Sequence, residues 1–212
     1  MKRHVISTPV LVFGLLLSAC ATAQQTRPMA SPPGVTTEER AGVNPQGSAA
    51  AKVRISAVTA TVQDIDLANR MVTIVGPDGK SFVVHADEQV RNLGQVKVGD
   101  KVTVEYYEGL VAEIAPPGAS PGEVKSATAL ARAPLGERPA GAVGKAITAN
   151  VVIQYVDPIR NVIHFKGPLG KTRIVKVMNP EFRTLLKTLK PGDQVTLTYF
   201  EAMAVSVKPA GN

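Results

Sequence analysis

The sequence predicts an all-β protein built from two similar small domains in tandem. A turn-forming block at 76–80, Gly-Pro-Asp-Gly-Lys, recurs at 167–171 as Gly-Pro-Leu-Gly-Lys. A second block, in which Gly-Asp precedes an aromatic pair and a Glu, occupies 99–108 and recurs at 192–201. The residues beside these blocks alternate between apolar and polar and are rich in β-branched types, which is typical of strands with one buried face. A duplicated β domain explains all three observations.

The first repeat, 52–116, is expected to form a small five-stranded barrel. A short helical or irregular connection at 87–95 separates its third strand from its fourth. In the fourth strand Val102, Val104 and Tyr106 share one face, which predicts one buried face and one solvated face. The five strands are expected at 53–66, 71–75, 80–86, 101–107 and 110–115.

The second repeat, 145–208, has the same order and two more residues between its blocks. Its connection predicts a clearer helix, because Asn179 can cap, Pro180 suits a first helical position, and apolar residues follow at helical spacing. Five strands with a short helix between the third and fourth are the order of an OB-type barrel. The strands are expected at 147–156, 161–166, 171–177, 194–200 and 203–207.

The N-terminal segment, 1–19, has the features of a secretory signal. A positive start is followed by an apolar run at 10–17 that is too short to span a bilayer. The segment ends in Leu-Ser-Ala before Cys20, which resembles the lipobox of bacterial lipoproteins. The resemblance implies that cleavage precedes Cys20 and that this residue is acylated, which anchors the protein to a membrane. The alternative is an ordinary signal with a cysteine near its cleavage zone.

The resemblance also bears on location, because Ala21 stands where an Asp favours retention in the inner membrane. We therefore expect the periplasmic face of the outer membrane. The composition of 20–51 predicts a disordered tether. The segment 117–144 is expected to be a linker, whose Ala-rich middle at 123–133 is either a short helix or flexible, and 209–212 is a short tail.

Charge and composition restrict the partners. Residues 53–115 of the first repeat carry six basic and nine acidic residues, and residues 145–208 of the second carry ten and four. Opposite charges would attract the two domains to each other, or the basic one would face an envelope protein or an anionic envelope polymer. The alternative is that both charged faces are only solvated and bind no partner. Aromatic residues make up 4% and there is no Trp, so nucleic acid is not an expected partner.

The candidate binding surface consists of an aromatic pair and a Glu that occur in both copies. In each repeat these residues fall between the fourth and fifth predicted strands, and in OB barrels that hairpin helps to form the ligand face. The alternative is a solvated hairpin tip. The six residues are Tyr106, Tyr107, Glu108, Tyr199, Phe200 and Glu201.

No pattern in the sequence indicates catalysis or a cofactor. No nucleophile has a His and a carboxylate at a readable spacing, and the Gly-rich turns lack the Lys-Ser/Thr ending of a phosphate loop. His85 and His164 occupy non-equivalent positions and are both expected to face solvent. The single Cys excludes an internal disulfide framework. The expected function is therefore non-enzymatic.

Each repeat also resembles the small periplasmic copper carriers of efflux systems. The shared pattern places Asp before a short strand and Gly-Asp before a later one; it spans 66–74 with 99–104, and 157–165 with 192–197. That family holds Cu(I) with a His, two Met and a Trp. This chain has no Trp, and Gly-Pro turns replace the Met pair, so the copper site does not carry over.

The sequence thus predicts a lipid-anchored binding or scaffolding module of the cell envelope. The alternative is a periplasmic metal carrier of the copper type, using His85, Met178 or Met203.

Overall fold

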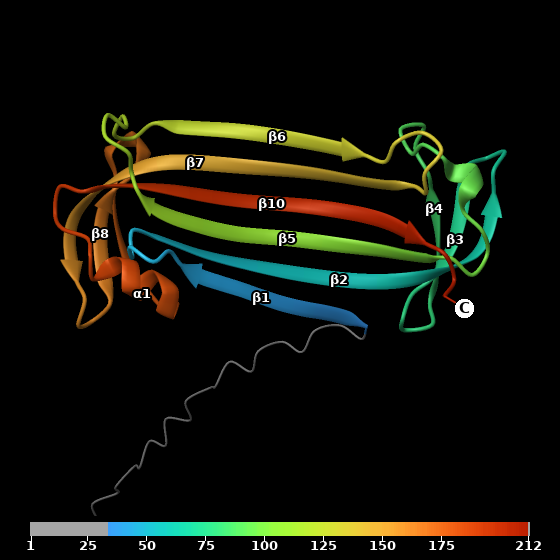
Figure 1. Ribbon diagram of the computed structural model, residues 1–212, viewed down its shortest axis with the longest axis horizontal. Coiled ribbons are helices and arrows are strands. Elements are labelled where there is room, and N and C mark those ends of the chain that lie inside the picture. The colour runs from blue at the N-terminus through green and yellow to red at the C-terminus, as the bar shows by residue number, and fades with distance from the viewer. Residues whose placement is uncertain (1–33, 212) are drawn as a thin grey trace, which may run out of the picture. The chain divides into compact units, whose positions relative to one another are not determined.

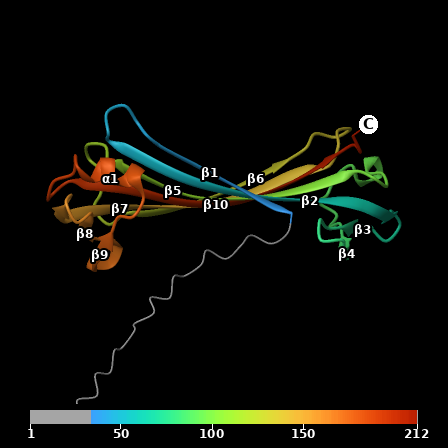
Figure 2. The same ribbon diagram turned by 90° about the horizontal axis from the view of Figure 1, so that it is seen from below.

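The computed structural model describes residues 34–211, which form one large antiparallel sheet with little helix (Figures 1 and 2). The predicted all-β class is confirmed. The signal segment and Cys20 lie outside the described residues. The strands are β1 (Val35–Val43), β2 (Ala49–Asp66), β3 (Met71–Val75), β4 (Ser81–His85), β5 (Lys101–Ile114), β6 (Val124–Arg132), β7 (Ala140–Asp157), β8 (Val162–Lys166), β9 (Thr172–Lys176) and β10 (Gln194–Lys208).

Two long strands, β5 and β10, lie at the centre of the sheet and pair with each other along their whole length. Strand β2 flanks β5, and β7 flanks β10. The outer strands occupy only part of these flanks. At one end β3 and β4 extend from β2 while β6 pairs with β7; at the other end β8 and β9 extend from β7 while β1 pairs with β2.

The pairing relates the two halves by an approximate two-fold axis. Glu108 of β5 lies directly opposite Glu201 of β10, which is its counterpart in the second copy. The neighbours on either side also correspond, since Arg54 of β2 pairs with Glu108 and Lys145 of β7 pairs with Glu201. The duplicated halves therefore meet as the subunits of a symmetric dimer do, although they belong to one chain.

Two separate hydrophobic cores lie at opposite ends of the long strands. One contains Ala112 and Val195 and is covered by helix α1 (Pro180–Leu186). The other packs against Val102 and Val207 and includes the short helix η1 (Leu93–Gln95). Side chains alternate along a strand, so these core residues are on the same face as Glu108 and Glu201. Each core uses strands of both repeats.

The two separate five-stranded barrels that the sequence predicts are not confirmed. The expected fourth and fifth strands of each repeat are continuous: 101–107 and 110–115 are both parts of β5, and 194–200 and 203–207 of β10. No turn forms at Glu108, because a straight β5 satisfies its backbone groups by pairing with the other repeat. The result is one open sheet shared by both halves.

Strands also occupy segments that composition assigned to a tether and a linker. Strand β1 lies within the expected tether, 20–51, and β6 lies within the expected linker, 117–144, where the Ala-rich stretch is extended and not helical. Both are mostly exposed edge strands that pair along the long strands β2 and β7. Their order comes from this pairing, which polar and Ala-rich composition does not reveal.

A close contact at the sheet centre generates the first prediction. Phe200 lies over Gly109, its neighbour across the ladder, so that a Cβ at position 109 would stand 2.4 Å from the ring. We expect Gly109→Ala to lower the free energy of unfolding by about 1–3 kcal/mol, because the ring must move in a packed site. Chemical denaturation of the full chain measures this.

The matched control is Gly42→Ala in the edge strand β1, where an added Cβ has no neighbour within 4 Å. This change should leave stability unchanged or raise it slightly, because it reduces the freedom of the unfolded chain. Equal stability of the two variants would mean that the Phe200 ring does not require a glycine opposite it.

Candidate binding site

The six residues of the predicted binding surface gather at the centre of the sheet, in the middle of continuous strands and not at hairpin tips. Because side chains alternate, the set divides between two faces. Tyr106, Glu108, Tyr199 and Glu201 share the face that carries the cores. Tyr107 and Phe200 are on the opposite face.

Contacts within the sheet occupy the polar groups of this centre. Glu108 and Glu201 are directly opposite, an arrangement that alone is unfavourable. Arg54 donates to Glu108 across 3.0 Å, and the Tyr106 hydroxyl donates to Glu201 across 3.3 Å. Partial burial together with the Glu201 carboxylate raises the pKa of Tyr106. These side chains mainly stabilise the junction between the two repeats.

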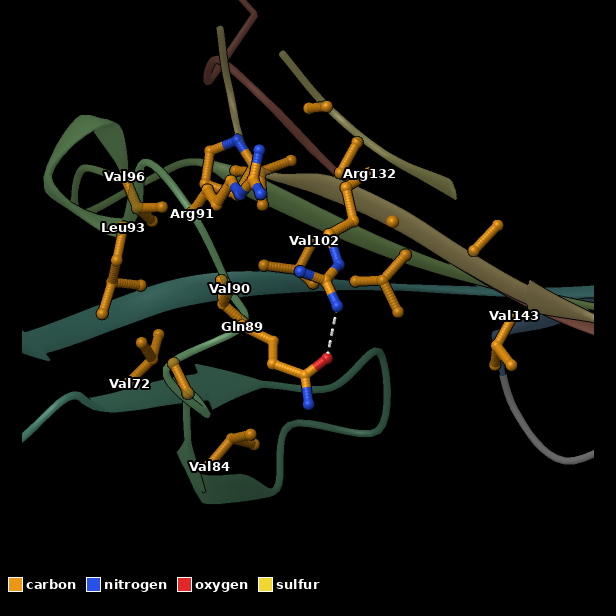
Figure 3. Close-up of a pocket in the computed structure, with 18 of the residues that line it drawn as sticks. Val72, Val84, Gln89, Val90, Arg91, Leu93, Val96, Val102, Arg132 and Val143 are labelled. Atoms are coloured by element: carbon orange, nitrogen blue, oxygen red, sulfur yellow. Dashed lines mark hydrogen bonds between the residues drawn. The ribbon is translucent and has the colours of Figure 1, made fainter. Parts of the chain in front are cut away.

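A cavity of about 470 Å³ lies instead at the first-repeat end of the sheet (Figure 3). Its wall is formed by β3, β4, the 86–96 connection and the adjoining ends of β5, β10, β7 and β6, so both repeats contribute. The lining is predominantly apolar, and much of it is open to solvent: Leu130 is 63% exposed, and Val143 and Met203 are each 47% exposed. None of the six centre residues lines it.

The cavity exists because the two repeats fill equivalent spaces differently. At the opposite end, helix α1 places Leu185 and Leu186 in the core, with Phe182 packed against it. The first repeat has two residues fewer in this connection and forms only η1, which supplies Leu93. Nine buried apolar residues make up the core under α1, but only five make up its counterpart. One end of the scaffold is therefore filled and the other is hollow.

Cationic and polar side chains stand among the apolar residues of the cavity. Arg91, Arg132, His85 and Gln89 line it, whereas no Asp or Glu does. The Arg132 guanidinium donates to the Gln89 side-chain oxygen across 2.5 Å, and Figure 3 shows this bond reaching from the end of β6 to the connection after β4.

Arg132 stands where the filled end has an apolar residue. It is the last residue of β6 and pairs with Gly141, as Val43 ends β1 and pairs with Ala50. Val43 packs against the core under α1. The hollow end thus presents a cation at a position that its counterpart uses for packing.

Hydrogen bonds tie the 86–96 connection to the loop between β6 and β7. Asn92, which has a φ of 64°, donates to the Pro134 carbonyl across 2.8 Å and accepts from the Gly136 N–H across 3.2 Å. Gln95 donates to the Gly136 carbonyl across 2.7 Å. These bonds hold the two sides of the cavity together.

A buried ion pair lies beside this loop. Asp100 is 3% exposed and pairs with Arg138 of the β6–β7 loop. Burial opposes ionisation of Asp100, but the Lys97 N–H, the Arg138 guanidinium and the Ala210 N–H together outweigh it, and the pKa of Asp100 lies below its usual value. The equivalent Asp193 accepts from the Lys190 N–H in the same kind of turn, with no guanidinium partner among the described residues.

The structure does not bring together all three residues of the predicted copper-type site, His85, Met178 and Met203. His85 and Met203 both line the cavity, but Met178 follows β9 and does not. His85 is exposed as expected, whereas His164 is half-buried and its ring centroid lies 4.9 Å from that of Tyr155. Within residues 34–211, no group of three or more His, Cys, Asp or Glu side chains is arranged to hold a metal ion.

Neither the cavity nor Arg132 was identified from the sequence. The sequence does contain a signal for the cavity: the connection of the first copy is two residues shorter and has one leucine, Leu93, where the second copy has Phe182 and three leucines. The shared Pro-x-Gly loops at 45–47 and 134–136 also mark β1 and β6 as parts of the duplication.

Compared with known proteins, the chain matches no family model, no curated sequence and no solved structure. No helix in the described part of the chain has the length and apolar character to cross a bilayer. Inference about function therefore starts from the geometry of this chain.

The Asp100–Arg138 pair generates a pH-dependent prediction. A carboxyl whose folded pKa is depressed stabilises the fold above its unfolded pKa, near the ordinary value of 3.8 for Asp, and this stability is lost as pH falls through the folded pKa. We expect Asp100→Asn to cost about 2–4 kcal/mol at neutral pH and to differ little from the parent chain in strong acid. Denaturation across a pH series measures this.

The control is Asp193→Asn, which removes the matching turn carboxylate without breaking an ion pair in the described structure. Its cost should be smaller, about 1 kcal/mol. Equal costs for the two variants would show that the turn contact, and not Arg138, supplies the stability at Asp100.

Proposed function

We propose that this chain is a lipid-anchored, non-enzymatic binding protein at the periplasmic face of the outer membrane, and that its cavity takes up an apolar ligand. The cavity carries this proposal. Its volume falls within the range of about 300–1,000 Å³ typical of small-molecule sites, and it combines an apolar lining with a few polar groups.

The energetic basis is the apolar surface left exposed in the cavity. Val143, Met203 and Leu130 face water where the other end has a closed core. Each methylene that a ligand buries contributes about 0.8 kcal/mol, so roughly ten methylenes supply about 8 kcal/mol before the cost of association. An apolar chain is therefore an adequate source of affinity without any catalytic group.

The N-terminal sequence supports the proposed location. The apolar run at 10–17 followed by Leu-Ser-Ala and Cys20 is the arrangement of a lipoprotein signal, and Ala21 favours the outer membrane. An anchored protein of this kind would meet lipids and hydrophobic molecules of the envelope. We also infer that the two halves descend from one five-stranded OB-like barrel, whose fourth and fifth strands merged into one long strand that pairs between the copies.

The copper-type carrier has less support. Only His85 and Met203 of its three candidate ligands line the cavity. A soft metal such as Cu(I) is selected by several sulfur ligands, and the cavity contributes one methionine.

Filling the cavity tests the proposed function. Val205→Phe places a ring into the lining from β10, and we expect it to weaken binding of dodecanol, a neutral apolar chain, by tenfold or more. Val124→Phe is the control, because it adds the same ring at an exposed position of β6 outside the cavity. Calorimetric titration of the full chain carrying Cys20→Ser, which removes the expected acylation site, gives the affinities.

Loss of binding in the Val205 variant alone would support the cavity as the site. Equal binding by both variants, or no binding by the parent chain, would contradict it.

The anchor is tested separately in cells that export the protein. The parent chain should fractionate with the outer membrane, and its mass should exceed that of residues 20–212 by attached acyl groups. Cys20→Ser should lose both properties, because the acylated residue is gone. A parent chain found unmodified in the soluble periplasm would contradict the proposed anchoring.

A further inference from the structure

We propose that the ligand of this cavity is a single-chain amphiphile with an anionic head group, bound with its apolar chain in the cavity and its carboxylate or phosphate at Arg132. This inference rests on the proposed function, because it names the ligand class of the same site.

Arg132 is the residue that favours an anionic ligand. In the part of the chain that the structure describes, neither Arg132 nor Arg91 forms a salt bridge, and Arg132 donates to a neutral amide, that of Gln89. A guanidinium binds a carboxylate or phosphate more strongly than it binds an amide, because both partners are charged and two parallel bonds can form. An anionic head group would therefore displace Gln89 from Arg132.

The surroundings of Arg132 favour the same charge. Arg91 also lines the cavity, and no Asp or Glu side chain of residues 34–211 does. The two acidic residues nearest to Gln89 in the sequence are engaged elsewhere: Asp87 accepts from the Gln89 N–H, and Glu88 lines a neighbouring hollow. An anion at Arg132 thus enters a site that is lined by two arginines and by no described acidic side chain.

A cavity with an apolar lining and a cation on one side is complementary to an amphiphile with an apolar chain and an anionic head group. Figure 3 shows Val102 beside the Arg132 side chain, and Val84 and Val143 also line the cavity, so a ligand that reaches the guanidinium has its remaining atoms among apolar groups. A volume of about 470 Å³ is in the lower half of the usual range for small-molecule sites, which suits one chain and not the two chains of a membrane phospholipid.

The test compares ligands that share a chain and differ in the head group. Laurate, dodecyl phosphate, dodecanol and dodecyltrimethylammonium are titrated, below their micelle-forming concentrations, into the full chain carrying Cys20→Ser. We expect the two anions to bind about tenfold or more tightly than dodecanol, and the cation to bind most weakly. The stronger of the two anions identifies a carboxylate or a phosphate as the natural head group.

Arg132→Met keeps an unbranched apolar side chain and removes the charged guanidinium. We expect it to bring the affinity for laurate down to that for dodecanol, because the charge that distinguishes the two head groups is gone. Arg132→Lys should retain part of the preference. Arg173→Met is the control, since Arg173 is an exposed arginine of β9 outside the cavity, and it should bind laurate as the parent does.

The outcomes separate the two proposals. Equal affinity for laurate and dodecanol, or an unchanged preference in Arg132→Met, overturns the anionic head group and leaves the apolar site intact. Failure of all four ligands to bind overturns both proposals. Far-ultraviolet circular dichroism of each variant establishes that a lost affinity is not a lost fold.

Discussion

The ladder between β5 and β10 is the interaction on which the rest of the structure depends. It joins the two repeats residue by residue along the whole of β5, and it carries the approximate two-fold axis at Glu108 and Glu201. Each core needs the ladder, because Ala112 and Val195 contribute to one core while Val102 and Val207 contact the other. Without it, neither repeat would have a complete set of strands to cover its apolar residues.

The two opposed carboxylates at the axis repel each other, and neighbouring groups of the junction offset this repulsion. Opposed carboxylates in a sheet are unfavourable, but each has a donor on a neighbouring strand: Arg54 of β2 donates to Glu108, and Tyr106 of β5 donates to Glu201. Phe200 over Gly109 adds close packing on the other face. The aromatic-Glu motif that is duplicated in the sequence is therefore understood best as the means by which one copy recognises the other.

The cavity arises because the two ends of the sheet are equivalent in their strands but are filled by connections of different length. The duplication provides two equivalent ends, and α1 fills one of them. The shorter connection in the first repeat leaves the other end open, with Arg132 where its counterpart has Val43. Divergence between two copies that share a sheet can thus create a binding site at one end while the other end maintains stability.

The sequence by itself determined the β class, the duplication, most short strands and helix α1, because alternation, turn residues and helical spacing are local properties. The tertiary structure alone decided whether Glu108 begins a turn or continues a strand, since that choice depends on pairing with residues about 90 positions away. It likewise ordered β1 and β6 and left the cavity beside Arg132. Composition describes what a segment contains, whereas pairing and packing depend on which distant segment it meets.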